Sequence, residues 1–490
     1  MEAPRFVCGN LEYDTSGCKR EGRFACKGCR LVNVRSAMKM PKAYWPQLKL
    51  ACMSPLGQGT WQPAWALESR LPSFVQGPLN QFIGPNKHLW GNTPAIDVLQ
   101  LDSNEGRDYD HDLRLLFAGI SGDLRNFIET IAQLPKSYDR SLDVVARNVI
   151  MLLLLLSMDE DDATIDCIIR FCCLGARVRP LIQGFCETIK DATRGSPHTQ
   201  DVAFGKRSLK VTLSKQSWYR LLTYFHVPTK LTVEHARSIR TANTLAESRR
   251  DVRDNYMSCL PPSHRITSYK FRKIGVLLPF DFPRHEFRVP NPLSSVVFQT
   301  WILSLTLPQL DAMKLPNHFY DKSFDRIEVS NIADQEFLGI HMTLYAMAPL
   351  LRNTVENPHA TLITLFLNAI QESLTHKEHS REMLKAHTNK YLSQYLFRKE
   401  KRIAVNDPRL IQLAMALPMV ENHEHVFQRF LANHKLHDVP KLIGMAMKES
   451  HTIVEKWPFR LKLRPDQAGA QAEFDRCITR GVTWREFYLE

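Results

Sequence analysis

The sequence predicts an α/β fold whose sheet is interrupted by a large helical insertion and preceded by a small cysteine-rich unit. Two strand–helix segments, around residues 113–133 and 324–366, flank a long stretch of mostly helical periodicity. Five of the 11 cysteines fall within the first 52 residues. The chain of 490 residues is 44% hydrophobic and 23% charged, which is typical of a globular protein with two or three domains.

Composition divides the chain into consecutive parts. A finger-like unit at 1–52 precedes a connector at 53–92 that is rich in Pro, Gly, Trp and Gln. The first half of the α/β domain is expected at 93–158 and a mostly helical insertion at 159–319. The second half, with a C-terminal helical region, is expected at 320–490.

The two halves of the α/β domain are predicted to share one sheet. The strands LRLLFA (113–118) and ATLITLF (360–366) are apolar enough to be buried on both faces, and each half offers too few strands to cover its own helices. The other expected elements are a helix ending at Pro135, a helix over Leu142–Met158, a strand over Phe324–Ser330, a helix over Leu338–Leu351, a helical stretch at 163–258, helices and irregular structure at 375–490, and an extended, hairpin-like excursion at 260–292.

Charge and hydropathy limit the partners. The net charge of +13 and pI near 9.2 permit a polyanionic partner without requiring one. Because the basic residues are spread along the chain, a solvated basic surface is the favoured interpretation, and any nucleic-acid binding would be non-specific. The longest apolar run, at 149–156, is far shorter than the roughly 20 residues of a membrane span, and the first residues carry no signal peptide. We therefore expect an intracellular protein, cytoplasmic or nuclear, with no membrane partner.

The cysteine cluster indicates metal rather than disulfides, because the expected compartment is reducing. Cys26 and Cys29 form a CxxC pair whose thiolates can share one zinc ion, and the intervening glycine allows the tight turn. Cys8, Cys18 and Cys52 lie within the same short stretch. A metal-free segment in which these cysteines are relics is the alternative, because structural zinc sites normally have four ligands.

This stretch resembles the MYND zinc finger of fungal proteins that continue into a domain of unknown function. The resemblance rests on CKGCRLV, the Lys42–Pro46 segment, Cys52, MSPL and TWQPAW. It implies two cross-braced zinc sites, of which the chain keeps Cys8 and Cys18 for one and Cys26, Cys29 and Cys52 for the other. Where the family has a further cysteine pair and a histidine, the chain has Arg35, Lys39 and Leu48. The finger is degenerate, and at most one zinc ion is expected.

The turn after the first strand has the shape of a nucleotide-binding turn. Gly119 and Gly122 would allow close backbone approach, and the start of the next helix, near Asp123, favours anions. With only two glycines the motif is weak, and an ordinary strand-to-helix turn capped by Asp123 is the alternative. Asp139 is the candidate for contacts to ribose hydroxyls, which completes the expected cofactor set of Gly119, Gly122, Asp123 and Asp139.

The order of elements resembles a methyltransferase-like Rossmann sheet. The fungal family shares this region with the N-terminal domain of dynein axonemal assembly factor 3, and the markers here are LWGNTPAID, SGDLRN, VARNVIMLL, FDRIEVSNIAD, PHATLITLF and FRLKLRPDQAGAQAEFD. Only three residues separate Pro135 from Asp139, too few for the second strand that should precede this acid. We therefore expect an incomplete sheet that binds S-adenosylmethionine weakly or not at all.

No set of a nucleophile with a partnered base is evident. The turn at 330–334 stands where methyltransferases place catalytic groups, but a polar, capped strand-to-helix turn explains it better. His341 and Met342 are expected to be packing residues rather than ligands. The resemblances imply a non-catalytic protein-interaction or adaptor protein that binds other proteins. The alternative is an S-adenosylmethionine-dependent methyltransferase or a degenerate descendant of one.

Overall fold

The structure is a computed structural model that forms two compact units. It describes residues 24–25, 33–34, 53–75, 94–118, 124–135, 137–138, 140, 142–146, 178–194, 196–204, 207–223, 231–275, 313, 316–317, 319–378, 381, 389–397, 404, 406–478 and 487–490. One unit comprises 1–86 with 153–305, and the other comprises 87–152 with 306–490. The short strands β1 (Phe24–Ala25) and β2 (Asn33–Val34) of the first unit pair antiparallel.

The second unit is built on an open, mostly parallel sheet. Its strand order is β4-β3-β7-β8-β9, and only β9 runs antiparallel to its neighbour. Leu115 of β3 pairs with Arg326 of β7, which confirms that the two distant segments share one sheet. The strands are β3 (Leu113–Phe117), β4 (Leu142–Ala146), β7 (Arg326–Glu328), β8 (Thr361–Phe366) and β9 (Phe487–Leu489).

Strand β4 corrects two expectations at once. Residues 142–146 were expected to begin a helix, and the second strand was expected to be missing, yet β4 pairs in register along all of β3. The β-branched residues Val144 and Val145 favour a strand. The apolar run continues beyond them, and periodicity alone does not distinguish a buried strand from a buried helix in such a run.

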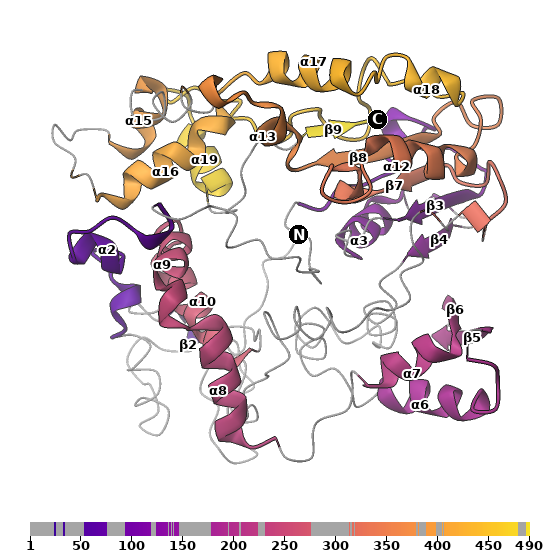
Figure 1. The fold of residues 1–490 in the computed structure, drawn as a ribbon, viewed down its shortest axis with the longest axis horizontal. Helices are drawn as coiled ribbons and strands as arrows, with labels where there is room; N and C mark the ends of the chain where they lie inside the picture. The colour runs from indigo at the N-terminus through magenta and orange to yellow at the C-terminus, as the bar shows by residue number, and fades with distance from the viewer. Residues whose placement is uncertain are drawn as a thin grey trace. The chain divides into compact units, whose positions relative to one another are not determined.

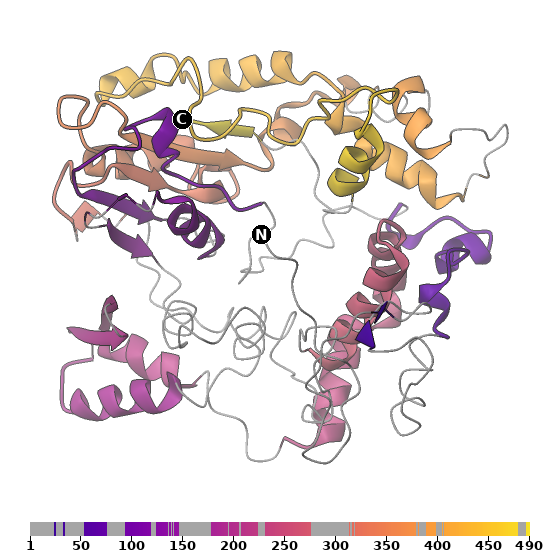
Figure 2. The same ribbon diagram turned by 180° about the vertical axis from the view of Figure 1, so that it is seen from behind.

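The sheet has an apolar core on each face, as its pattern of buried residues predicts. On one face Leu116, Ile327 and Phe366 pack with helices α12 (Ile340–Met347) and α17 (Glu424–Asn433). On the other, Leu115 and neighbouring residues of β3 and β8 pack with the 96–101 segment and α3 (Leu124–Gln133). Figure 1 shows α12 and α17 near β8, and Figure 2 shows the sheet from behind, with α3 beside β3 and β4.

A buried charged network holds the amino ends of the central strands. Arg326 donates to Glu105 over 2.8 Å, and the two side chains are 0% and 1% exposed. Asp325 accepts from Arg352 at 2.8 Å and from Asn357 at 2.8 Å, and Asn357 also donates to Glu105. The network ties the segment that precedes β3 to β7 and β8.

The C-terminal region contains helices and irregular segments, as expected, and also the strand β9, which was not expected. Glu490 follows β9, and its buried carboxylate accepts from the backbone N–H groups of Thr452, Ile453 and Val454 at 2.9–3.0 Å. The remaining helices of this unit are η4 (Leu101–Ser103), η8 (Ser330–Ala333), η9 (Ala348–Leu350), α13 (Ala369–Ser373), α15 (Lys390–Leu396), α16 (Pro408–Ala416), η10 (Leu417–Met419), α18 (Val439–Leu442) and α19 (Ala470–Ile478).

In the first unit, residues 53–75 are irregular, as expected of a connector, but they are packed rather than free. Arg70 donates twice to Asp251 of α9 (Arg250–Ser258), at 2.6 and 2.8 Å, and Trp65 is fully buried. The backbone N–H of Ala64 donates to Asp254 at 3.0 Å. The short elements of this segment are η1 (Pro55–Gly57), α2 (Ala64–Leu67) and η2 (Ser73–Val75).

Two parts of the predicted helical insertion have other structures. An antiparallel hairpin, β5 (Pro197–Phe204) with β6 (Arg207–Ser214), lies between α6 (Val178–Thr188) and α7 (Lys215–Thr223). The segment SLKVTLS alternates apolar and polar residues, which favours a strand, but the helical periodicity of the flanking segments led to the prediction of a helix. A helix, α10 (Pro262–Ile274), begins the stretch expected to be extended. Helices α8 (Val233–Thr244) and η5 (Glu247–Arg249) complete the insertion as described.

None of the helices in the described ranges is both long and apolar enough to cross a bilayer.

Candidate functional site

The order in which successive strands are added to the sheet reverses between β3 and β7, and this reversal creates a crevice position at the carboxyl edge of the sheet. From β3 the chain moves to β4 on one side, and from β7 it moves to β8 on the other. Phe117 and Glu328 are paired at this edge, and the N–H of Ala118 donates to the Glu328 carbonyl at 2.8 Å. Ligands of open α/β sheets bind where the strand order reverses, at the carboxyl ends of the strands, so a ligand site is expected at this edge.

The loop that leaves β7 turns sharply. Ser330 has a left-handed backbone with φ of 51°, and its N–H donates to the Glu328 carboxylate at 2.7 Å. Glu328 is 2% exposed. The carboxylate thereby holds the turn that follows its own strand, and η8 begins immediately afterwards.

Asp334 connects this loop to the loop after β8. Its carboxylate accepts from the N–H groups of Leu367 at 3.0 Å and Asn368 at 3.3 Å, and the residue is 1% exposed. Loss of water raises the pKa of Asp334 to about 7, although the two backbone donors oppose the shift. Acidic groups at this edge thus join loops of the protein to one another.

The structure confirms only part of what the sequence predicts for the turn at 330–334 and for helix α12. The segment forms a polar turn as expected, but the N-cap position of η8 is Val329, which makes no side-chain capping hydrogen bond, rather than Asn or Ser. His341 and Met342 are not packing residues: Met342 is 45% exposed, and the exposed His341 bonds through Nε2 to the carbonyl of His434 at 2.8 Å. Both lie on the face of α12 that is turned away from the sheet.

The predicted ligand residues lie outside the described residues. This holds for the cofactor set, Gly119, Gly122, Asp123 and Asp139, and for the metal set, Cys8, Cys18, Cys26, Cys29 and Cys52. In chain order, Asp139 precedes β4 instead of following it, whereas a ribose-binding acid follows its strand. Within the part of the chain that the structure describes, no group of three or more His, Cys, Asp or Glu side chains could hold a metal ion.

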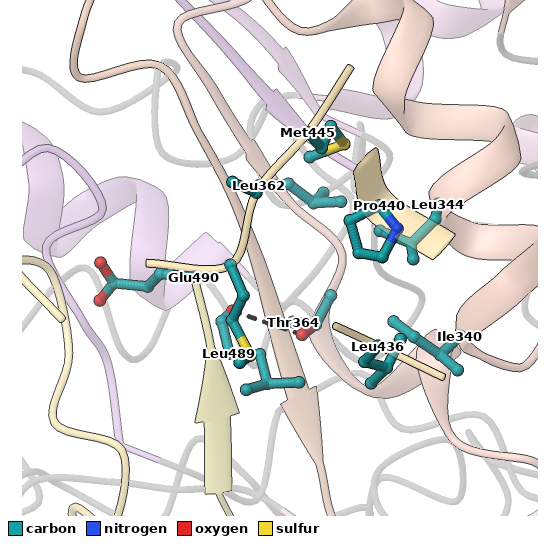
Figure 3. Close-up of a pocket in the computed structure, with 11 residues that line it drawn as sticks. Ile340, Leu344, Leu362, Thr364, Leu436, Pro440, Met445, Leu489 and Glu490 are labelled. Atoms are coloured by element: carbon teal, nitrogen blue, oxygen red, sulfur yellow. Dashed lines mark hydrogen bonds between the residues drawn. The ribbon is translucent and has the colours of Figure 1, made fainter. Parts of the chain in front are cut away.

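A small apolar pocket lies between β8, β9 and the helices on that face (Figure 3). Its volume is about 50 Å³. Thr364 contributes a hydroxyl that donates to the Leu489 carbonyl at 3.3 Å, and Figure 3 shows the Glu490 carboxylate directed away from the other lining groups. The lining residues are Ile340, Leu344, Leu362, Thr364, Leu436, Pro440, Met445, Ala446, Met447, Leu489 and Glu490.

Several large apolar side chains that are close in sequence to the lining residues of this pocket are exposed. Tyr345 follows the lining residue Leu344 and is 67% exposed, and Met342 lies one turn away on α12. Leu442 is 84% exposed and Ile443 37% exposed, at the end of α18 beyond the lining residue Pro440. Sequence patterns missed this site because its residues come from four separate segments, and each segment resembles ordinary core.

A polar groove of about 710 Å³ lies on the other face of the sheet. Asp97, Asp102 and Arg107 line it together with the last turns of α3, and Arg107 is paired with Asp102. Desolvation raises the pKa of Asp97, and the N–H groups of Leu99 and Gln100 donate to it. The carboxylate of Asp97 therefore holds its own turn.

Comparison with known proteins relates only part of the chain to a family. Residues 89–173 match a family described as a domain of unknown function (DUF4470). All residues that line the polar groove except Ile453 lie within this match. No curated protein and no solved structure matches the chain.

Proposed function

We propose that the chain is a non-catalytic adaptor that binds an apolar segment of another protein at the pocket beside α12. The observation that carries this proposal is the apolar pocket, together with the exposed Tyr345, Leu442 and Ile443, which follow its lining residues Leu344 and Pro440 closely in the chain. Aromatic residues and Met are enriched where proteins bind one another, and a contiguous apolar surface marks such sites.

The size of the pocket favours a side chain over a cofactor. Small-molecule sites usually enclose about 300–1,000 Å³. At about 50 Å³ the pocket has room for the end of one apolar side chain. An anchor residue of a partner would fill it, while Tyr345 and Leu442 would cover the flanking parts of the partner segment.

The N-terminal cysteine cluster supplies the second binding module of this proposal. Cys26 and Cys29, with Cys52 and one of Cys8 or Cys18, would hold one zinc ion. We expect at most one tightly bound zinc per chain in metal analysis of the purified protein, and Cys26→Ser should lose it. Two tightly bound equivalents would show that the finger is intact rather than degenerate.

Partner binding is tested with matched surface variants of the full chain. Tyr345→Glu and Leu442→Glu should remove a protein that co-purifies with the wild type, and calorimetry with that purified protein should show a loss of at least about tenfold in affinity. Val355→Glu is the control, because Val355 is 93% exposed and does not line the pocket. Equal binding by all three variants, each with an unchanged melting temperature, would refute the site.

One observation favours a methyltransferase as the second candidate. The order of the four parallel strands, with antiparallel β9 at the edge, is compatible with a methyltransferase-like Rossmann sheet, and β4 removes the objection of a missing strand. Against it stand the acids of the carboxyl edge: Glu328 and Asp334 are engaged with backbone groups of their own loops. We therefore keep the adaptor as the proposed function.

A further inference from the structure

The turn between α6 and β5 places a serine hydroxyl against a histidine. Ser196 Oγ lies 2.7 Å from His198 Nε2 and 2.7 Å from the carbonyl oxygen of Thr193, to which it donates. Ser196 is partly buried, while Thr193 and Arg194 are exposed. The hydroxyl therefore lies at the surface, on a defined turn with an imidazole beside it.

Positive charge surrounds this turn. The carbonyl of Ser196 accepts from the N–H of Lys215, the first residue of α7, at 3.3 Å, so the turn meets the positive end of that helix. The Lys215 ammonium group donates to the carbonyls of Lys190 and Ala192 in the same turn. Arg194 lies two residues before Ser196, and the exposed Asp191 is the acid in the turn.

We propose that Ser196 is a phosphorylation site for a proline-directed protein kinase. The kinase would transfer the γ-phosphoryl group of ATP to Ser196 Oγ: the bond from the γ-phosphorus to the ADP oxygen breaks, the Oγ–P bond forms, and the hydroxyl proton passes to the base of the kinase. Pro197 follows the acceptor and biases Ser196 toward an extended backbone, the conformation in which kinases bind their substrates.

The surroundings distinguish Ser196 from the other candidates in the chain. A serine or threonine precedes proline at Ser54, Thr93 and Ser196. Ser54 lies at the start of η1 with no side-chain hydrogen bond to that helix, and Thr93 lies outside the described residues. At Ser196 the phosphate would lie beside His198 and would gain charge-assisted hydrogen bonds from Lys215 and Arg194 in place of the bond to Thr193.

Mass spectrometry of the full-length protein, purified from its own cells with phosphatase inhibitors, tests the site. We expect phosphate on Ser196, lost in Ser196→Ala and retained in the matched variant Ser54→Ala. Phosphate found only at Ser54 or Thr93, or at none of the three, would overturn the proposal.

A second measurement tests the surroundings. In ³¹P NMR of protein phosphorylated in vitro, the second pKa of phosphoserine 196 should lie at least about 0.5 units below the value of about 6 for an exposed phosphoserine. His198→Gln and Lys215→Gln should return it toward that value. A phosphate that titrates like an exposed one in the wild type would contradict the proposed contacts.

Discussion

At the scale of single residues, the carboxyl edge contains an acid that is held in an unfavourable environment. Burial raises the pKa of Asp334 to about 7, against 3.8 for the free group, because the ionised form loses water. The folded state therefore holds its proton more tightly than the unfolded state. The stability contributed by this group is fully present below about pH 4 and is lost as the pH rises toward 7.

Asp334→Asn removes this dependence, because the amide keeps a carbonyl oxygen for Leu367 or Asn368 and cannot ionise. The free energy of unfolding of the wild type should fall between pH 4 and 7, relative to the variant, by on the order of 2–4 kcal/mol. Chemical denaturation across this range measures the difference. Parallel pH profiles for the wild type and Asp334→Asn would contradict this account.

The Glu105–Arg326 ion pair is the second residue-scale test. Arg326→Met leaves Glu105 charged and buried, which should cost about 3–5 kcal/mol in denaturant titrations. Changing both to Met and Gln should recover part of this loss, because no unpaired charge remains. The exposed pair of Arg107 and Asp102, at 73% and 54% exposure, provides the contrast: Arg107→Met should cost far less than Arg326→Met, because solvent screens this pair. Equal costs at the two arginines would refute the account of the buried network.

At the scale of elements, the sequence predicted those with strong local patterns. Strand β3, helix α3, strands β7 and β8 and helix α12 lie where apolar runs and helical periodicity indicated. Strand β4 was missed because its apolar run continues past its end, and β9 because three residues carry too little pattern. The apolar pocket was not predictable, since β8, β9 and the helices meet only through tertiary packing.

The segment at 53–75 gives the element-scale prediction. Asp251 accepts from Arg70 and from the N–H of Ser73, and it is 4% exposed. Asp251→Ala should release the segment from α9, so its amides should exchange with solvent at least about tenfold faster in hydrogen-exchange mass spectrometry.

Glu247→Ala is the matched control, because Glu247 pairs with Arg250 at the surface and is 77% exposed. It should leave exchange at 64–75 unchanged. If Asp251→Ala also left it unchanged, the segment would be held by its other contacts, which include the buried Trp65 and the hydrogen bond from Ala64 to Asp254.

At the scale of the whole molecule, the central sheet joins parts of the chain that are far apart in sequence: Leu115 pairs with Arg326, more than 200 positions later. The complementarity of the two halves predicted this arrangement. The function could not be read from the fold, because the same sheet order serves binding proteins and enzymes. The acids at the carboxyl edge decide between them in our account, since Glu328 and Asp334 are used within the protein.

Calorimetric titration of the full-length protein with S-adenosylmethionine tests this central claim most directly. A non-catalytic adaptor predicts no saturable heat, with a dissociation constant weaker than about 1 mM. Low-micromolar binding that is abolished by Gly122→Val would contradict the claim and establish the carboxyl edge as a cofactor site.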